Sequence, residues 1–395
     1  MNKIKHLFLS ILAVVLFIAC ENNTPAPYPV PQQQADKTLF VYMPWSASRT
    51  SNYGSLYNAF QQNLRDMKAG IVADGGLHRN RLMVFISTSA TTAVMMEITY
   101  DNGVCRQDTL ERYTATNIPA FTTPDGIAHI LNKVKYKAPA QTYAMLIGCH
   151  GTGWLFANGA SRAKTRYFGG SDSYFQTNIP TLAQGISRAG MQMQYIMFDD
   201  CYMSNIEVAY ELRNVTDYLI GCCSEIMAYG MPYQKMWRYL TQLSPDYGKI
   251  VDEFHDFYSN YSTPCGNIGI TNCNRTEEMA QVMRAINTTN TFNLADTTNV
   301  QKLDGYRNTI FYDMGAYVSR LCTDPTLYTA FQSALNQLTP FKSTTPDIYT
   351  SLGQLPYNRI NVNTFSGITI SDPTVSNFER AIVTKTQTGW WKATH

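Results

Sequence analysis

Short apolar runs alternate with helical periods through the first half of the chain. Apolar residues recur at spacings of three and four over 53–73 and 124–134, which predicts two helices. Asp101-Asn102-Gly103 between two further runs predicts a β-hairpin. Short apolar stretches bounded by turn residues predict buried strands at 38–43, 81–87, 143–147 and 195–198. This order predicts an α/β fold with a mainly parallel central sheet and helices on both faces.

Two of these strands are followed directly by polar residues. The run Ala144–Ile147 leads through Gly148 to His150. The run Tyr195–Phe198 leads to Asp199, Asp200 and Cys201. Open α/β sheets place their sites at the carboxyl ends of the strands. We therefore expect His150 and Cys201 to share one edge of the sheet.

A thiol paired with an imidazole indicates nucleophilic catalysis. A lone buried cysteine is usually a small hydrophobic residue, and a lone histidine is more often structural. In a pair, the imidazole can take the thiol proton and the thiolate can attack. A metal-dependent hydrolase using His150, Cys201, Asp199 and Asp200 is the less favoured reading. The two adjacent carboxylates point in different directions, and a catalytic zinc usually has three protein ligands.

The segments around these residues resemble the clostripain family of cysteine peptidases. The resemblance rests on His150-Gly151-Thr152-Gly153-Trp154 and Asp199-Asp200-Cys201-Tyr202-Met203, with Glu207 and 209–212 behind the second block. It covers most of the chain after about residue 37 and is dense between 143 and 233. It implies a caspase-like fold, cleavage after Arg or Lys, and a dyad of Cys201 and His150. It also implies that the backbone N–H groups of Gly151 and Cys201 bind the oxyanion.

The two acidic residues before Cys201 are expected to differ in role. In the family, the position of Asp199 lies at the floor of the pocket for the substrate's basic side chain. A buried carboxylate is unfavourable without a cation, and a substrate Arg or Lys would provide one. Either residue could instead cap a helix starting near Tyr202, and for Asp200 we expect the cap. Negative charge at Asp200 should raise the pKa of Cys201 unless the carboxylate is turned away.

The segment 151–178 between the two blocks is long and polar. Loops of this length in compact domains are usually functional or disordered. A surface loop with solvated charges would account for the composition. The resemblance implies self-cleavage between the catalytic His and Cys, and we expect Lys164 or Arg166 as the site.

The N-terminal segment has the pattern of an export signal. A basic start precedes an apolar stretch, 7–19, that is too short to span a membrane. Ala19-Cys20 resembles a bacterial lipoprotein processing site, so we expect Cys20 to carry a lipid outside the cytoplasm, in the cell envelope. Ordinary signal cleavage is the alternative. Residues 21–37 are rich in Pro and Gln and predict a tether. We expect a catalytic domain at 38–287 and a C-terminal subdomain packed on the sheet at 288–395.

The composition of the chain limits the classes of partner and cofactor that we expect. A net charge of +2 gives no reason to expect nucleic acid. The nine cysteines show no zinc spacing, and the chain has no EF-hand pattern, so we expect no metal or other cofactor, although some relatives require calcium. Because export permits disulfides, Cys265 with Cys273 is the pair to test first. We expect a monomer that acts on peptide or protein substrates.

One alternative to an enzyme stays open at this point. The Pro-rich tether and exposed aromatics also suit a peptidase-like surface protein that binds glycans or peptides without cleaving them. Such a protein gives no reason for Cys201 to be alkylated faster than the other thiols.

Overall fold

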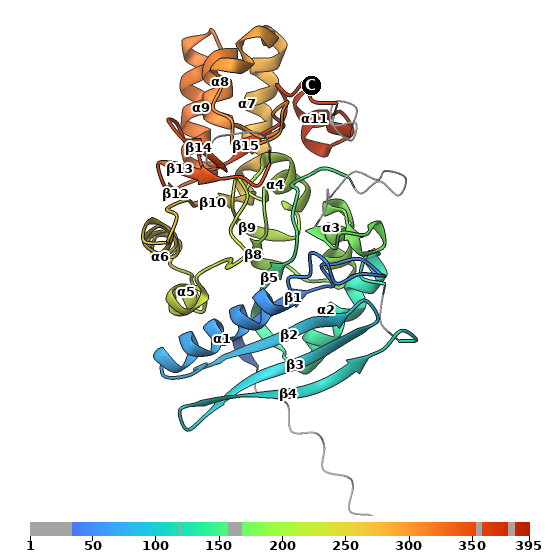
Figure 1. Cartoon of the computed structure of the whole chain (residues 1–395). Helices are drawn as coiled ribbons and strands as arrows, with labels where there is room; N and C mark the ends of the chain where they lie inside the picture. Colours follow the sequence, from blue (N-terminus) through green and yellow to red (C-terminus); the bar gives the residue numbers. More distant parts are fainter. Residues whose placement is uncertain (1–33, 118–119, 157–167, 353–357, 378–383) are drawn as a thin grey trace, which may run out of the picture. The chain divides into compact units, whose positions relative to one another are not determined.

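A nine-stranded sheet forms the centre of the fold (Figure 1). The computed structural model describes residues 34–117, 120–156, 168–352, 358–377 and 384–395. The strand order is β12-β10-β9-β8-β5-β1-β2-β3-β4, and the five inner strands β9, β8, β5, β1 and β2 are parallel. Their bounds are β1 Ala35–Met43, β2 Asn80–Ser89, β5 Ala140–Gly148, β8 Met193–Asp199 and β9 Thr216–Gly221. The expected α/β architecture is confirmed.

Antiparallel strands complete both edges of the sheet. At one edge, β3 (Thr92–Asp101) and β4 (Val104–Tyr113) form the expected hairpin. Asn102 and Gly103 have φ angles of 49° and 84°, which is the left-handed geometry that a tight hairpin turn requires. At the other edge, β10 (Asn267–Asn272) pairs with β9 and with β12 (Phe341–Thr344).

Helices cover both faces of the sheet, as Figure 1 shows. Alternate residues of each strand point to opposite faces, so each face has its own apolar core. One core packs under α2 (Pro124–Lys137), α3 (Ile179–Arg188) and α4 (Ile206–Leu212). The other packs under α1 (Tyr57–Ala73), α5 (Tyr233–Leu240) and α6 (Tyr247–Ser259).

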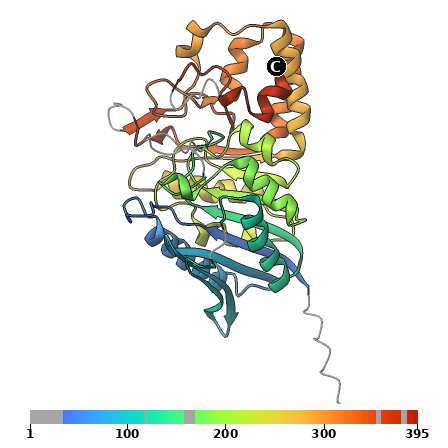
Figure 2. The same ribbon diagram turned by 90° about the vertical axis from the view of Figure 1, so that its right-hand side faces the viewer.

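The C-terminal part adds helices and short strands beyond the β10–β12 edge (Figure 2). Its elements are α7 (Thr276–Thr289), η3 (Leu294–Asn299), β11 (Tyr312–Asp313), α8 (Met314–Leu321), α9 (Pro325–Leu338), β13 (Asp347–Tyr349), β14 (Arg359–Asn361), β15 (Thr369–Ile370) and α11 (Gly389–Thr394). Most of them surround a third core that contains Trp390, whereas β13 and β14 contribute Ile348 and Ile360 to a fourth, smaller core. Residues 34–395 form a single compact unit, and a functional division near residue 287 remains a prediction.

Cys265 and Cys273, the pair to test first, do not form a disulfide. All eight cysteines in the described part of the chain are free thiols. Cys265 and Cys273 lie beyond opposite ends of the extended strand β10. At about 3.3 Å per residue they are roughly 25 Å apart, whereas a disulfide needs Cα atoms within about 7 Å.

Several expectations concern residues outside the described part. These are the signal segment, the lipid-bearing Cys20, most of the tether, and the cleavage candidates Lys164 and Arg166. Among the described residues, no helix combines the length and the apolar character needed to cross a membrane.

Candidate active site

The candidate catalytic residues follow two strands that are neighbours in the sheet. β5 and β8 run parallel, and their last residues, Gly148 and Asp199, are paired in register. His150 and Cys201 each lie two residues beyond that pair. The fold therefore brings both side chains to the same edge of the sheet, as the sequence predicted.

His150 is fixed by contacts with two distant segments. Its backbone N–H and C=O exchange hydrogen bonds with Gly169, at N···O distances of 3.2 and 2.9 Å. Its ring Nε2 lies 2.8 Å from the carbonyl oxygen of Gly54. Because a carbonyl can only accept, Nε2 carries the proton, and Nδ1 of the neutral ring is left as an acceptor. Burial lowers the pKa of His150, which favours this neutral form.

Gly54 is a site residue that the sequence did not reveal. It lies in the turn before α1 with a φ of 79°, a conformation that suits glycine. A Cβ atom at this position would lie 3.8 Å from Nε2 of His150. Its contribution is a backbone carbonyl, so no side-chain pattern could have marked it.

Cys201 lies on a sharp turn between β8 and α4. The next residue, Tyr202, has a φ of 63° and donates its N–H to the carbonyl of Ser224 at 2.9 Å. The Tyr202 ring stacks on Phe311 with centroids 4.9 Å apart. A non-glycine residue in the left-handed region indicates a turn held by its surroundings. Cys201 as a whole residue is half-buried.

The surroundings of Cys201 hold its thiol in the protonated form. Burial is the main reason that its pKa is raised, and the negative charge of Glu225 is the second. The backbone N–H of Ile226 acts in the opposite direction. Glu225 is positioned by Ser351, whose N–H lies 3.0 and 3.1 Å from the two carboxylate oxygens. No pattern in the sequence indicated this effect of Glu225 on the thiol.

Gly151 lies against the backbone of Cys201. A Cβ atom on Gly151 would come within 2.6 Å of the Cys201 carbonyl oxygen and 3.1 Å of its nitrogen. Only glycine allows this close approach of the two loops. The structure thus brings together the two residues whose N–H groups were expected to bind the oxyanion.

Asp199 is buried beneath the loop at 230–233. One oxygen accepts the N–H of Met231 at 2.9 Å, and the other accepts the hydroxyl of Tyr233 at 3.0 Å. Burial raises its pKa to about 7, while these two hydrogen bonds lower it. Each oxygen keeps one further lone pair for another donor.

The expectation that Asp200 caps a helix is wrong. The helix α4 begins only at Ile206, and the side chain of Asn205 caps it through the N–H of Val208 at 3.2 Å. Asp200 turns back to Cys149, accepting its N–H at 2.7 Å and its thiol at 3.2 Å. The left-handed turn at Tyr202 delays the helix, so Asp200 is too far from its first N–H groups to cap it. Turned this way, it still raises the pKa of Cys201, but less than Glu225 does.

Comparisons with known proteins agree with this arrangement. The model of the clostripain family matches residues 49–341. A secreted C11 cysteine protease of Bacteroides thetaiotaomicron, "iotapain", is 44% identical with a TM-score of 0.83, over 92% of this chain and 100% of its own. A clostripain from the same organism, in complex with a peptide inhibitor, is 50% identical with a TM-score of 0.55, over 58% of this chain and 99% of its own.

A more distant structure extends the comparison. An inactive zymogen C11 protease from Parabacteroides distasonis is 26% identical with a TM-score of 0.77, over 93% of this chain and 100% of its own. A search of curated proteins gave no match. The family match over most of the chain and the fold shared with C11 proteases lead to one conclusion: this chain belongs to the clostripain family and is a cysteine peptidase.

Proposed function

We propose that this peptidase is an exported endopeptidase that cleaves after Arg or Lys, with Cys201 as nucleophile and His150 as base. The observation that carries the proposal is the placement of both residues two positions beyond a register pair of strands. The hydrogen bond from His150 to Gly54 supports it, because it orients the ring and leaves Nδ1 free to accept a proton.

The steps follow from the protonation states. Both groups are neutral at rest, so the thiol proton passes to Nδ1 of His150 as the sulfur attacks the scissile carbonyl. The N–H groups of Gly151 and Cys201 hold the oxyanion. The imidazolium then protonates the leaving amine, which leaves a thioester on Cys201. Water, deprotonated by His150, hydrolyses the thioester and restores the thiol.

The basic specificity is assigned to Asp199. Its carboxylate has one donor on each oxygen and one lone pair free on each, so it can accept a guanidinium or ammonium group. Pairing with a substrate cation would favour the charged form of this buried carboxyl, whose pKa is about 7. The inhibitor named for the B. thetaiotaomicron clostripain, VLTK, ends in lysine, which supports the same preference here.

Export and self-processing complete the proposal. The C11 protease iotapain is named as secreted, which supports a location outside the cytoplasm for this chain. Cys20 is the proposed lipid-bearing residue. A relative is named an inactive zymogen, which supports activation by cleavage, and Lys164 or Arg166 is the proposed site. A Cys201→Ala chain should then remain intact while the wild-type chain is cut between His150 and Cys201.

The test uses matched peptides that differ only in the residue before the cleaved bond: Arg, Lys, Leu or Asp. Turnover of the Arg and Lys peptides, absent in Cys201→Ala, is expected. Equal turnover by wild type and Cys201→Ala would refute the assigned nucleophile. Turnover of the Leu peptide at the rate of the Arg peptide would refute the basic specificity.

A further inference from the structure

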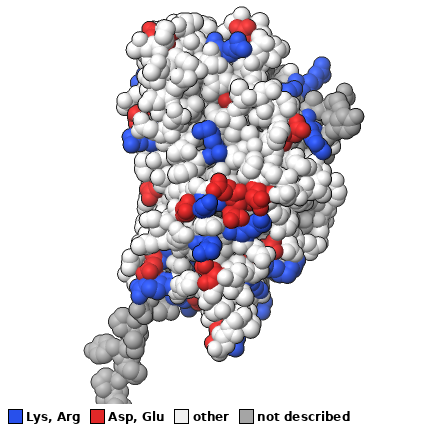
Figure 3. All heavy atoms as spheres, turned by 90° about the vertical axis from the view of Figure 1, so that its left-hand side faces the viewer, with Lys and Arg blue, Asp and Glu red and all other residues white. Residues whose placement is uncertain are grey.

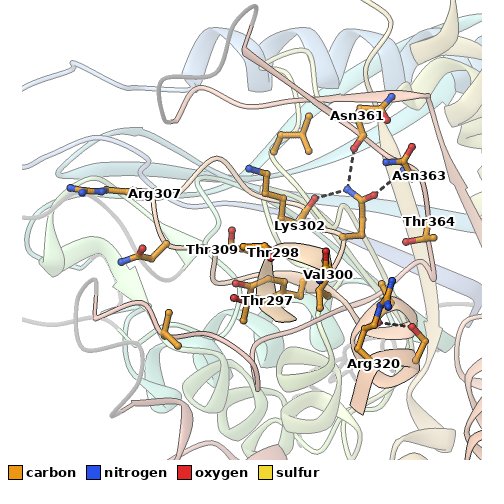
Figure 4. A pocket seen from close by; sticks show the side chains of 18 of the residues that line it. Thr297, Thr298, Val300, Lys302, Arg307, Thr309, Arg320, Asn361, Asn363 and Thr364 are labelled. Carbon is orange, nitrogen blue, oxygen red and sulfur yellow. Dashed lines mark hydrogen bonds between the residues drawn. The ribbon is translucent and has the colours of Figure 1, made fainter. Parts of the chain in front are cut away.

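A second pocket lies in the C-terminal part of the protein, built from residues outside the two catalytic loops. Its volume is about 790 Å³ (Figure 4). Four segments form most of its lining: the end of η3 with residues 300–302, the loop 307–309, the outer side of α8, and the stretch from β14 to 364. Tyr312 and Val375 complete it. Gln301 joins two of these walls by donating to the carbonyl of Asn361 at 3.0 Å and accepting the N–H of Asn363 at 2.8 Å.

The charged side chains lining this pocket are all basic. They are Lys302, Arg307, Arg320 and Arg359, and no Asp or Glu occurs among the described lining residues. All four are exposed. Arg359 lies 3.8 Å from Asp347, whereas no ion pair within the described part of the chain involves the other three. In the view of Figure 4, Arg307 and Arg320 lie toward opposite ends, with Lys302 between them.

Charge elsewhere on the surface is arranged differently. On the face that carries α5 and α6, acidic and basic side chains gather together (Figure 3). Lys235 pairs there with Asp256 at 2.7 Å, and Lys249 pairs with Asp252 at 3.2 Å. These charges largely neutralise one another. The pocket instead concentrates four cations, three of them without an ion-pair partner among the described residues, in a chain whose net charge is only +2.

One acidic residue close in sequence to the lining loop is turned inward. Asp304 is buried and accepts the N–H groups of Tyr306, Ile310 and Phe311 at 2.7–2.9 Å. Its carboxylate is therefore used to shape the loop 305–311 and does not face the pocket. The outer residues of this loop, Arg307 to Thr309, form the wall.

The same loop touches the catalytic turns. Phe311 ends it and stacks on Tyr202, the residue after Cys201. A Cβ atom on Gly153, which follows His150 by three residues, would lie 2.9 Å from the Phe311 ring. One side of this short loop thus packs on the catalytic turns while its other side lines the basic pocket.

We propose that this pocket is an exosite that binds an acidic segment of the polypeptide substrate. Recognition of acidic motifs by clusters of Arg is a recurrent mode of peptide binding. The Thr and Asn side chains between the cations offer hydrogen bonds to the backbone of such a segment. The inference rests on cleavage of polypeptides, and it does not need the basic specificity assigned to Asp199. It makes an acidic stretch, apart from the cleaved bond, a determinant of which proteins are cut.

Binding is measured first, because it needs no turnover. The probe is a fluorescent peptide of Asp and Glu without Arg or Lys, titrated with the full chain and followed by anisotropy. We expect binding that weakens as ionic strength rises from about 0.05 to about 0.5 M, since exposed charges are screened over that range. An Arg307→Gln/Arg320→Gln variant should bind less tightly. The control Arg106→Gln/Arg112→Gln removes two exposed charges from β4 and should bind like wild type.

The kinetic arm compares two substrates with the same cleavable sequence, one extended by an acidic tail and the other by an uncharged tail. The wild-type ratio of kcat/KM, acidic over uncharged, should be about fivefold, because each exposed ion pair contributes little alone. It should fall toward one in the Arg307/Arg320 variant and stay at the wild-type value in the control. A general loss of activity in a variant lowers kcat/KM for both substrates equally, so it cancels in this ratio.

The outcomes separate the proposal from its rivals. An equal loss of binding in both double variants would mean nonspecific charge attraction and would overturn the exosite. Binding of a sulfated oligosaccharide without binding of the acidic peptide would overturn the proposed ligand class. A wild-type ratio of one with intact turnover would overturn the exosite and leave the catalytic assignment standing. If the wild-type protein bound the acidic peptide but cleaved neither substrate, the catalytic assignment would be overturned and the exosite would stand.

Discussion

At the scale of single residues, the site combines a neutral thiol with a neutral imidazole. The pKa of Cys201 is raised by burial and by Glu225, and the pKa of His150 is lowered by burial. The sequence indicated Cys201, His150 and Asp199 because each follows a strand end. It could not indicate Glu225, Ser351 or Gly54, whose effects depend on segments brought together only by the fold.

The effect of Glu225 on the thiol can be measured directly. In Glu225→Gln the negative charge is gone, so the thiolate is less disfavoured and the pKa of Cys201 falls. The midpoint of the alkylation rate against pH should move to lower pH than in wild type. Glu278→Gln on α7 removes an equal charge elsewhere and should leave the midpoint in place. Coinciding curves for wild type and Glu225→Gln would contradict this account of the thiol.

The role proposed for Asp199 predicts a change of specificity. Asp199→Asn keeps the shape and removes the charge that would pair with a basic substrate. We expect kcat/KM for Arg and Lys peptides to fall about 100-fold, since a hydrogen bond to a charged group contributes up to about 3 kcal/mol. The Leu peptide should be affected much less. An equal loss on all peptides would point to a structural role through Met231 and Tyr233 instead.

At the scale of elements, hydrophobic patterns predicted the central strands and the helices that flank them. These hydrophobic patterns failed in two segments that are largely irregular. The segment 304–338 reads as mostly helical, but residues 304–311 form a loop because Asp304 binds its backbone N–H groups. The pattern of residues 365–371 predicts a strand, but only Thr369–Ile370 are in one. In the first place a carboxylate binds N–H groups of its own loop. In the second, Asp313 and Glu207 from distant segments accept the N–H groups of Ser366 and Ser371.

Helix packing gives a sharp test at this scale. Gly70 of α1 lies so close to α5 that a Cβ atom would be 2.5 Å from Cβ of Trp237. Alanine favours helices over glycine by about 1 kcal/mol, but overpacking of a core costs about 1–3 kcal/mol. We therefore expect Gly70→Ala to lower the free energy of unfolding in urea.

The matched control is Gly248→Ala in α6, where the nearest atom would be 3.5 Å from the new Cβ. That substitution should be neutral or slightly stabilising. Equal stability of the two variants would mean that the contact between α1 and α5 is looser than described.

At the scale of the whole molecule, several buried carboxyls are protonated more readily than usual. Burial raises the pKa of Asp199 and of Asp304 to about 7. Burial together with the neighbouring Asp372 raises the pKa of Glu207, which lies in α4 and accepts the N–H of Ser371 at 2.8 Å. Unfolded carboxyls titrate near pH 4, so the folded state holds protons that the unfolded state releases.

The sign of the pH dependence follows from this difference. The stability linked to these groups is fully present below about pH 4 and is lost as pH rises through about 7, by about 1.4 kcal/mol per pH unit for each group. We expect Tm to fall between pH 5.5 and 8, and to fall less steeply in Glu207→Gln.

The exposed Asp256 provides the control, because its pKa is lowered by Lys235 and it is ionised throughout this range. Asp256→Asn should keep the wild-type slope of Tm against pH. A Tm that rises with pH in the wild-type protein would contradict the burial of protonated carboxyls.

One measurement tests the catalytic assignment most directly. Two peptidyl acyloxymethyl ketones that differ only in a terminal Lys or Leu are incubated with the protein, and the adduct is located by mass spectrometry. The assignment predicts one adduct, on Cys201, formed much faster with the Lys inhibitor and slowed by His150→Ala. An adduct on another cysteine, or equal rates for the two inhibitors, would contradict it.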